Sequence, residues 1–528
     1  MEPHLRILLL CVLYCPIEHG LAQQITFSEH ISPIIYEHCT GCHRPGEIGP
    51  MSLTSYQEVA AWANMIRYVT EIRYMPPWTA DPSYRHFLGE NTLTDADIHL
   101  IGDWVDGGSV QGDPMQEAPL PAFPTGSLLG QADTIISLEE AWLHAGNNED
   151  DYRCFVIPTQ YTEDKDIAAV EFRPGNTNIV HHALFAIDEQ QASAAPDAAD
   201  STYGYPCFGG FGFMPSGTFV SYTPGQIPIL YPDGIGDRLP AGADVVFQIH
   251  YAPTAVPSTD SSSLLLFFSP EPVDRYVDGF VAASAIDFML LNGPFVLQPE
   301  EVKTFHLVRI AHMDMSLLTV YPHMHLLGTD IEIYAVTPSG DTIPLINIPE
   351  WDFNWQRSYN FDRMVKIPQG SVIHYFGTYD NSSNNPFNPN DPPQLVQWGE
   401  RTQDEMMLIG MRYVPYQEGD EWIPLGDDSS TSSEQLISLS HSLFQSWPNP
   451  SSGSLSLGFE LGFPDEVSLN IQDLLGRRVW TLLDRTPMGS GHHQLDLQTL
   501  ELTAGIYLYR LSTKSGFQAS RRLLVGKK

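Results

Sequence analysis

The sequence predicts a multidomain, mainly β protein with one small helical module near its N-terminus. The chain has 528 residues, which at roughly 100–200 residues per domain is enough for three or four domains. Its 42 prolines, 41 glycines and 11% aromatic residues are typical of short strands separated by turns. Hydrophobic residues make up 42% and charged residues 17%, which excludes a disordered chain.

The chain is strongly acidic. Asp and Glu number 64 against 26 Lys and Arg, for a formal net charge of −38. Nucleic-acid binding needs clustered cations that neutralise phosphates, so this composition argues against a nucleic-acid partner. Docking on an anionic membrane surface is disfavoured for the same reason.

Residues 1–22 have the pattern of an export signal. Arg6 precedes an apolar run over residues 7–14, and the small residues Gly20 and Ala22 fit a signal-peptidase site before Gln23. A buried N-terminal helix is the alternative. No later segment reaches roughly 18 consecutive apolar residues, so we expect a mature protein with no membrane span.

The cysteines fall into groups. Two of the six lie within the export signal, and two more belong to the motif described next. Cys154 and Cys207 remain, and in an oxidising compartment two such cysteines most simply pair. Two buried free thiols are the alternative.

The segment Cys39-Thr40-Gly41-Cys42-His43 is a C-x-x-C-H haem-attachment motif. Its two thiolates form thioethers to the porphyrin vinyl groups, and its imidazole reaches the iron from one side. A redox C-x-x-C or half of a zinc site is the alternative. Neither needs the histidine, and no second C-x-x-C exists to complete a zinc site.

A sixth iron ligand must come from downstream of this motif. Met75 is the candidate, because two following prolines stiffen the loop that presents its thioether. Met51, Met65 and His86 compete with it, and ordinary core packing is its alternative role.

Two helices are predicted in the same region. Apolar residues at helical spacing indicate a helix between Ser55 and Thr70, and Thr94 followed by early acids begins a second one that runs through Trp104. Helices around a C-x-x-C-H motif resemble a small all-α cytochrome c domain, here over residues 25–112. Pro and Gly around residues 112–126 indicate a linker.

Residues 130–415 have a β pattern that carries three groups of histidines. An H-x-H spacing sends both imidazoles to one face of a strand, whereas adjacent histidines share a face only at a bulge or strand end. In hydrophobic strands, unligated imidazoles would each need hydrogen-bond partners, so we favour metal ligands over satisfied core residues. For the group with a single histidine, His250, the core interpretation would be preferred if it stood alone. The groups are His181 with His182, His250 with Gln248 on one strand face, and His323 with His325.

The donor types favour copper. Zinc takes three histidines or histidines with a carboxylate, whereas copper accepts imidazole and thioether together, and sulfur favours Cu(I). Met406, in Asp404-Glu405-Met406-Met407, offers the thioether, although an isolated Met pair is more often part of a core.

These motifs resemble the copper type II, ascorbate-dependent monooxygenases, which include peptidylglycine α-hydroxylating monooxygenase and dopamine β-monooxygenase. The family's H-H, Q-x-H-Y, H-x-H followed by Leu-Gly, and D-E-M occur here in the same order. They match His181-His182, residues 248–251, residues 323–328 and residues 404–406.

The resemblance implies two antiparallel, jelly-roll-like β-sandwich domains, residues 130–290 and 291–415, with one copper ion each. It implies an electron-transfer copper held by His181, His182 and His250, and an O2-binding copper held by His323, His325 and Met406. The position of Cys154 resembles a disulfide position of the family, which implies a bridge from Cys154 to Cys207.

Two departures disfavour a peptidylglycine substrate. The amidating members have an Arg two residues before H-x-H and a Tyr four residues after the Met ligand, where this chain has Tyr321 and Gly410. Tyr321 could hydrogen-bond a neutral substrate, but we favour strand packing.

The resemblance also implies a chemistry. The family hydroxylates a C–H bond with O2, using electrons usually supplied by ascorbate. We expect the tethered haem c to feed electrons mainly to the His181, His182 and His250 site, replacing or supplementing ascorbate. A docking site for a separate redox partner is the alternative role of the haem. Gln248 is a candidate to organise water or substrate, with strand hydrogen bonding as its alternative.

The C-terminal residues 441–528 follow a polar linker over residues 416–440. Trp447-Pro448-Asn449-Pro450 begins the region, strands are predicted over residues 467–471 and 505–511, and the chain ends in basic residues. This pattern resembles the C-terminal sorting domain of type IX secretion, a small β-sandwich recognised by outer-membrane machinery. A generic immunoglobulin-like binding domain is the alternative.

Together these features predict a secreted or cell-surface copper monooxygenase that acts on a small organic substrate, with two copper ions and one covalent haem c. A non-enzymatic electron-transfer or copper-binding protein is the main alternative. A zinc hydrolase is the third, and it lacks a general base beside the histidines because no H-E-x-x-H is present.

Overall fold

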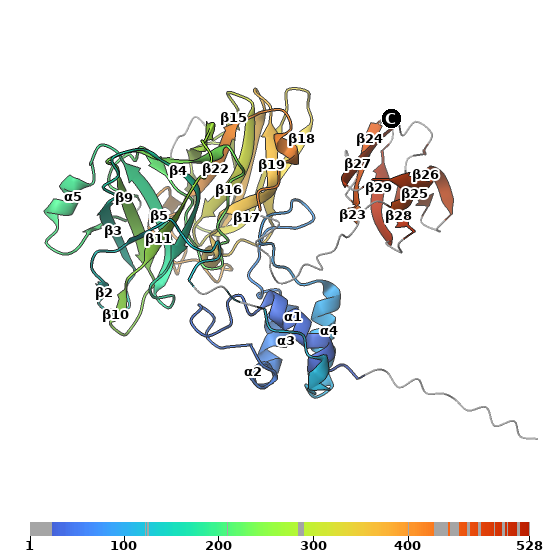
Figure 1. The fold of residues 1–528 in the computed structure, drawn as a ribbon, viewed down its shortest axis with the longest axis horizontal. Helices are drawn as coiled ribbons and strands as arrows, with labels where there is room; N and C mark the ends of the chain where they lie inside the picture. Colours follow the sequence, from blue (N-terminus) through green and yellow to red (C-terminus); the bar gives the residue numbers. More distant parts are fainter. Residues whose placement is uncertain are drawn as a thin grey trace, which may run out of the picture. The chain divides into compact units, whose positions relative to one another are not determined.

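The computed structural model describes residues 24–121, 123, 126–208, 210–283, 290–399 and 401–426, and parts of the C-terminal region between residues 442 and 526. The chain divides into two compact units, residues 1–430 and 431–528 (Figure 1). The predicted export signal, residues 1–22, lies outside the described residues. None of the helices in the described part of the chain is long and apolar enough to cross a membrane.

The first unit begins with a group of short helices, drawn in blue in Figure 1. They are a π-helical turn Phe27–Ile31, α1 (Ser32–His38), α2 (Tyr56–Ala61), α3 (Ala63–Glu71) and α4 (Asp95–Asp106). The helix predicted between Ser55 and Thr70 is therefore two helices, because the backbone leaves helical geometry at Trp62. The second predicted helix is confirmed: Thr94 caps α4 in a reciprocal capping box with Asp97.

The helices share a small core but do not stand apart from the rest of the unit. Phe27, Val59 and Trp104 are fully buried in that core. The segment between α3 and α4 leaves it and packs on a β-sheet: Phe87 forms a β-bridge with Phe361, and the Leu88 N–H donates to the Asn360 carbonyl at 2.8 Å. Backbone hydrogen bonds therefore join the helical module to the β part.

The first pair of sheets follows the helices. Their inner faces meet in a core that includes Phe172 and Leu264 from one sheet and Phe185 and Phe247 from the other. One sheet has the order β1 (Thr134–Ser137), β11 (Ser263–Phe268), β4 (Lys165–Arg173), β8 (Ile235–Leu239), β12 (Arg275–Tyr276). The other has the order β6 (Tyr205–Pro206), β3 (Asp151–Pro158), β9 (Asp244–Tyr251), β5 (Val180–Asp188), β7 (Gly217–Thr218). The short strands β2 (Trp142–His144) and β10 (Ser258–Asp260) pair beside them, and a short helix, α5 (Ala194–Ala199), lies between β5 and β6 in the chain.

A second pair of sheets forms the larger core of the unit. Leu317 and Ile409 from one sheet meet Phe305 and Ile333 from the other. One sheet has the order β13 (Asp278–Ala283), β22 (Met407–Pro415), β16 (Met315–Met324), β19 (Tyr359–Ile367). The other has the order β15 (Glu301–Ile310), β20 (Val372–Asn381), β17 (Gly328–Val336), β18 (Thr342–Ile348). A small pair, β14 (Val296–Leu297) and β21 (Val396–Gln397), lies outside them.

The sheets place two boundaries differently from the sequence. Strand β13 pairs with β22 and so belongs to the second pair of sheets, although it precedes the predicted boundary at residue 290. The predicted linker also begins too early, because Leu425 is fully buried and the Asp420 carboxylate accepts hydrogen bonds from Arg275 and Ser316 at 2.7 and 2.6 Å. Residues 416–426 therefore pack within the first unit. Residues 427–441 lie outside the described residues.

The second unit has two sheets around its own core of Leu, Ile, Phe and Tyr residues. The predicted strands over residues 467–471 and 505–511 are confirmed within β25 and β28. The segment around Trp447–Pro450 lies outside the described residues. The sheets are β23 (Ser442–Leu443), β24 (Ser454–Leu461), β27 (Gly491–Gln498), and β26 (Arg478–Met488), β25 (Asp465–Asp473), β28 (Gly505–Thr513), β29 (Gln518–Val525).

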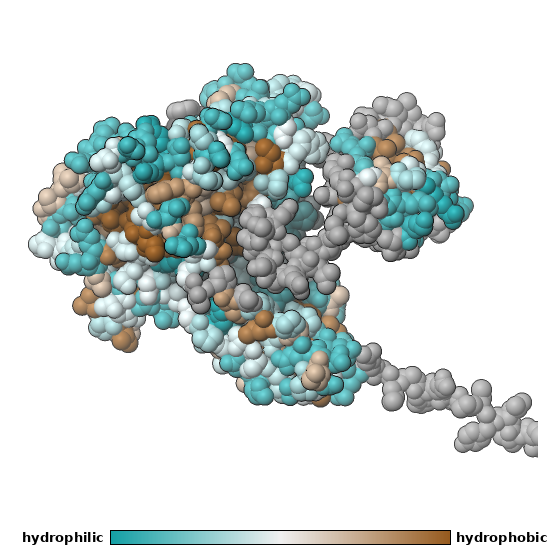
Figure 2. Space-filling view, viewed as in Figure 1, coloured by the Kyte–Doolittle hydropathy of each residue, from teal (hydrophilic) through white to brown (hydrophobic). Residues whose placement is uncertain are grey.

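The surface of the first unit is mainly hydrophilic on the face shown in Figure 2, where apolar side chains gather in a band near the middle. The described chain is mainly β in both units, as the sequence predicts.

Candidate metal and haem sites

The adjacent histidines of β5 share one face because the strand bulges between them. The pairing of β5 with β9 shifts register between Val180 and His182. This is the bulge that the sequence analysis required, since adjacent residues of a regular strand point to opposite faces. His182 lies directly opposite His250 on β9, and His181 turns toward both.

The three imidazoles form a compact triangle, which we call the three-histidine set (His181, His182 and His250). Their Nδ1 atoms lie 3.2, 3.2 and 3.3 Å apart. An ion about 2.0 Å from each nitrogen in tetrahedral geometry would separate the nitrogens by about 3.3 Å. The triangle therefore has the dimensions of a three-histidine metal site, and these residues were predicted together from the sequence.

A carboxylate fixes the tautomer of one ligand. The Nε2 atom of His250 lies 2.7 Å from Asp150 Oδ1. With the Nε2 proton donated to Asp150, the Nδ1 lone pair faces the triangle, as a metal ligand requires. The ring of Tyr152 stacks on His250 at a centroid distance of 4.1 Å and an angle of 3°, which fixes the plane of the imidazole.

Burial keeps two of these imidazoles, those of His181 and His182, neutral. Burial, with His250 as a second cause, lowers the pKa of His181 to about 4. Burial also lowers the pKa of His182, and His250, His181 and His323 lower it further. A neutral imidazole has the lone pair that a metal ion needs, so metal binding here does not compete with protons near pH 7.

The second predicted set comprises His323, His325 and Met406. The two imidazoles lie on one face of β16 and just beyond its end, with ring centroids 5.1 Å apart and planes at 86°. The Nδ1 atom of His325 donates to the Asp404 carbonyl at 3.0 Å, so in the neutral imidazole Nε2 carries the lone pair. The Nδ1 atom of His323 is buried and has no hydrogen-bond partner among the described residues, which fits a metal-ligating atom.

Strand register distinguishes the two neighbouring methionines. On β22, Leu408 lies opposite His323 and Met407 lies opposite Met324. Directly opposite residues share a face, so Met406, one residue before Met407, belongs to the face that carries the histidines. Met407 is fully buried in the core on the other face. Met406 is the methionine that fits the second set.

A buried glutamate joins the two segments that carry the second set. The Glu405 carboxylate accepts backbone N–H bonds from His325 at 3.0 Å, Leu327 at 2.8 Å and Met406 at 3.0 Å. Burial raises its pKa to about 8, although the three N–H groups act in the opposite direction. Glu405 thus fixes the segment after β16 against the segment before β22.

The loop that leads to Met406 also approaches the three-histidine set. Arg401 and Asp404 lie beside the imidazole of His325, and Thr402 lies beside the hydroxyl of Tyr152, the ring stacked on His250. Together with the effect of His323 on the pKa of His182, these contacts place the two sets close to each other within the first unit.

The two positions that depart from the amidating enzymes pack on each other. Gly410 lies directly opposite Tyr321, and a Cβ atom at Gly410 would lie 3.5 Å from the Tyr321 Cβ atom. The ring of Tyr321 also lies nearly parallel to His323, with centroids 6.0 Å apart. These contacts agree with the strand packing favoured from the sequence.

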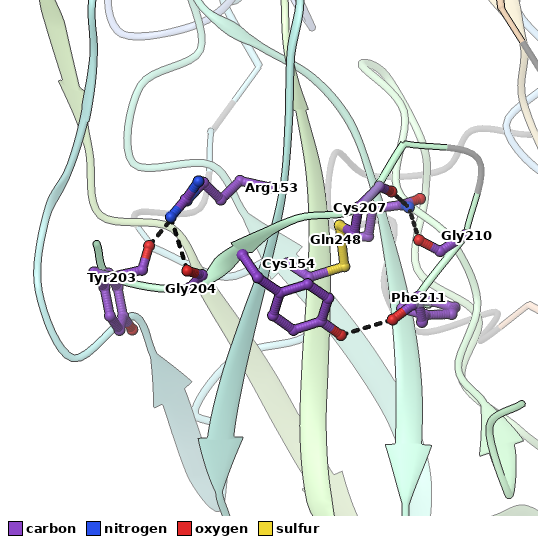
Figure 3. The surroundings of a disulfide bond; sticks show 9 residues. Arg153, Cys154, Tyr203, Gly204, Cys207, Gly210, Phe211 and Gln248 are labelled. Atoms are coloured by element: carbon purple, nitrogen blue, oxygen red, sulfur yellow. Dashed lines mark hydrogen bonds between the residues drawn. A yellow bond between two sulfur atoms is a disulfide. The ribbon is translucent and has the colours of Figure 1, made fainter. Parts of the chain in front are cut away.

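A disulfide joins Cys154 on β3 to Cys207, with Cα atoms 5.7 Å apart (Figure 3). Gln248 lies beside it, and its amide donates to the carbonyls of Cys207 and Gly210 (Figure 3). The Gln248 side chain is buried and its amide is used by this loop. The contacts of Gln248 are therefore hydrogen bonds to a loop, whereas the alternative given from the sequence was hydrogen bonding within a strand.

The contacts of the C-x-x-C-H motif are compatible with haem attachment. Cys39 and Cys42 do not form a disulfide with each other. The Nδ1 atom of His43 lies 3.1 Å from the Met51 carbonyl, so with its proton donated there Nε2 is left to bind iron. Burial raises the pKa of the Cys39 thiol to about 12, which is typical of sulfurs in an apolar cleft. These residues fit a covalently bound haem.

Two of the competitors of Met75 have other surroundings. Met65 is 49% exposed on α3, and the exposed His86 lies 2.9 Å from Glu90, whereas Met51 is half-buried like Met75. Met75 is half-buried, and its N–H donates to the Val69 carbonyl at the end of α3. Met75 remains the predicted axial ligand.

Comparison with protein families identifies the C-terminal region. Residues 445–526 match the secretion system C-terminal sorting domain. The chain therefore carries a type IX sorting domain, which is recognised by the type IX secretion machinery and directs export to the cell surface or the medium. No curated protein matches the chain.

Solved structures add nothing to this assignment. A β-glucuronidase from Parabacteroides merdae is 12% identical over 50% of this chain, with a TM-score of 0.15, and the match spans 31% of the enzyme. A β-D-mannosidase from Dictyoglomus thermophilum is 14% identical over 43% of this chain and 29% of that enzyme, with a TM-score of 0.14. A tetra-tandem repeat of a large adhesion protein is 8% identical over 72% of this chain and 75% of its own, with a TM-score of 0.15.

Proposed function

We propose that the first unit is a copper-dependent monooxygenase that hydroxylates a C–H bond of a small organic substrate with O2. The observation that carries the proposal is the triangle of Nδ1 atoms 3.2–3.3 Å apart in the three-histidine set. A second set with imidazole and thioether donors lies near it, and a pure carrier would need only one of the two.

The residues of the two sets have distinct tasks in this proposal. His181, His182 and His250 hold one copper ion, with Asp150 keeping the proton of His250 on Nε2. His323, His325 and Met406 hold the other, with the Asp404 carbonyl keeping the proton of His325 on Nδ1. Imidazole with thioether suits an ion that cycles through Cu(I), the state that reacts with O2.

The reaction requires an external source of electrons. One C–H bond and one O2 take up two electrons and two protons and give one alcohol and one water. Copper in these sets would supply the one-electron redox steps when bound. A haem c on Cys39, Cys42 and His43, with Met75 as the sixth ligand, would pass electrons to them, beside or in place of ascorbate.

Metal content is the first test. Mature protein produced with haem maturation and copper should contain two copper ions and one iron per chain by mass spectrometry. One copper would favour the carrier function, and zinc that copper cannot displace would contradict the monooxygenase.

A matched pair of variants tests the chemistry. His323→Ala should abolish substrate-dependent O2 uptake and lower copper to one per chain, because the three-histidine set stays intact. His374→Ala is the control. His374 lies on β20, in the other sheet of the same pair, and its Nδ1 atom lies 2.8 Å from Nε2 of His306. Absence of substrate-dependent O2 uptake in wild-type protein with every reductant would favour the electron-transfer function.

A further inference from the structure

Two tyrosines of β20 are fully buried in the larger core of the first unit, where an unpaired hydroxyl group would be costly. Each hydroxyl donates to a backbone carbonyl that belongs to the opposite sheet or to the segment leading into it. Tyr379 donates to the Met406 carbonyl at 2.8 Å, and Tyr375 donates to the His323 carbonyl at 3.4 Å. Both acceptors therefore belong to predicted ligands of the second set.

Packing fixes the Tyr379 hydroxyl in place. The Tyr379 ring contacts Phe295 and Phe305, with ring centroids 5.3 and 5.7 Å away. A Cβ atom on Gly377, the preceding inward position of β20, would lie 3.4 Å from the Tyr379 hydroxyl oxygen and 3.2 Å from Sδ of Met324. The hydroxyl thus occupies a closely packed position from which it reaches the Met406 carbonyl.

Met406 is held at both of its peptide groups. Its N–H donates to the Glu405 carboxylate at 3.0 Å, and its carbonyl accepts the bond from Tyr379 at 2.8 Å. A methionine side chain has three rotatable bonds and adapts easily, so a defined sulfur position needs a fixed backbone beneath it. A ligand that is already fixed before the ion arrives lowers the cost of binding.

We propose that Tyr379 is a positioning residue of the second set, which fixes the backbone of Met406 so that its thioether faces the ion shared with His323 and His325. Tyr375 contributes less, because its bond to the His323 carbonyl is the longer of the two. The inference rests on the proposed function, since it assigns a task to a residue behind the proposed copper ligands.

The test compares Tyr379→Phe with Tyr359→Phe. Tyr359 is a buried tyrosine of the same core whose hydroxyl oxygen lies 2.8 Å from Oγ1 of Thr79, so each variant loses one buried hydroxyl group. X-ray absorption of the Cu(I) protein detects copper-bound sulfur, which the second set offers and the three-histidine set does not. Tyr379→Phe should weaken the copper–sulfur contribution, and Tyr359→Phe should leave it as in the wild type.

Copper affinity gives the size of the effect. In a His250→Ala background, competitive titration reports Cu(I) binding at the second set. Tyr379→Phe should weaken this binding about fivefold, which is the factor by which one buried hydrogen bond biases an equilibrium. Tyr359→Phe should stay within about twofold of the parent, because its hydroxyl contacts neither set.

Hydrogen exchange of metal-free protein tests the positioning role without copper. In Tyr379→Phe, the Met406 amide should exchange about fivefold faster than in Tyr359→Phe, because the peptide segment loses one of its two anchors. Mass spectrometry of a proteolytic fragment that contains Met406 measures this rate. Equal exchange rates, or equal copper–sulfur contributions in the two variants, would overturn the inference.

The failure of this inference is distinguishable from failure of the proposed function. Wild-type protein whose copper shows no bound sulfur would contradict the proposed second set and this inference together. A copper–sulfur contribution that is present in the wild type and unchanged in Tyr379→Phe would contradict only the positioning role of Tyr379.

Discussion

Asp150 should control copper affinity at the three-histidine set although it is not a ligand. Its Oδ1 atom lies 2.7 Å from His250 Nε2, and this hydrogen bond is the largest cause of the lowered pKa of Asp150. Carboxylates that orient ligating histidines contribute about 10–100-fold to metal affinity. The Asp150 side chain is 45% exposed, so solvent weakens the interaction and we expect the lower end of that range.

The prediction is that Asp150→Asn weakens Cu(I) binding about tenfold, equivalent to about 1.4 kcal/mol. The substitution keeps the size of the side chain but removes the charge that holds the proton on Nε2. Competitive titration against a chromogenic Cu(I) chelator measures the affinity. The measurement is made in a His323→Ala background, so that the titration reports Cu(I) binding at the three-histidine set.

Glu149→Gln is the control, because it removes the same charge one residue away. Glu149 is exposed, and its Oε2 atom accepts a hydrogen bond from Asn147. It should leave the affinity unchanged within about twofold, since an exposed charge without a ligand contact is screened by solvent. Equal affinities for Asp150→Asn and Glu149→Gln would refute the argument that Asp150 sets the tautomer of His250.

Three further predictions concern stability. Glu405→Ala leaves three buried N–H groups without their acceptor and should lower the free energy of unfolding, measured by chemical denaturation, by at least about 3 kcal/mol. An unchanged denaturation midpoint would contradict this. Cys207→Ser opens a loop with a sequence separation of 53 residues and should lower the free energy of unfolding by about 4 kcal/mol. Its denaturation midpoint should equal that of the wild type after reduction of the disulfide. Metal-free protein should lose thermal stability as the pH falls from about 6.5 to 4. The histidines of the unfolded chain bind protons with a pKa of about 6.5, whereas the pKa of folded His181 is about 4. His181→Ala should flatten this pH dependence, and an equally steep profile would count against it.

The sequence predicted residues whose role follows from local spacing. The adjacent histidines of β5 required a bulge, and the structure has one between Val180 and His182. The H-x-H spacing placed His323 and His325 together, and the start of α4 followed from Thr94 and the acids after it. Spacing along one strand or helix fixes such relations, because period and capping are local properties.

Residues that act through tertiary proximity escaped the sequence analysis. Asp150 is 100 residues before His250 in the chain, and nothing in its neighbours distinguishes it from other surface acids. Glu405 was part of a motif, but its role as a common acceptor for two segments depends on how β16 and β22 pair. The packed residues around Asp420 were predicted to be linker because their composition is polar. In retrospect, the signal in the sequence is a single acidic residue next to a predicted strand or metal ligand. Such residues are too common for this signal to identify a functional one.

The contacts of the helical module change the argument for a tethered electron donor. A donor on a flexible linker acts through effective concentration, which depends on linker length. Here the backbone bonds of Phe87 and Leu88 to β19 hold the module against the β part, so electron transfer would depend on a fixed distance instead. In the proposed function, two routes would lead from the haem to the histidine sets. The backbone of Tyr222 pairs with that of Ala183, the neighbour of His182. Arg357 adjoins Gln356, whose side chain opposes the lowering of the His323 pKa by burial. Delivery to the three-histidine set stays a prediction; its route would pass the backbone pairing at Ala183, with two hydrogen bonds of 2.8 and 3.0 Å, whereas the route through Gln356 would depend on side chains.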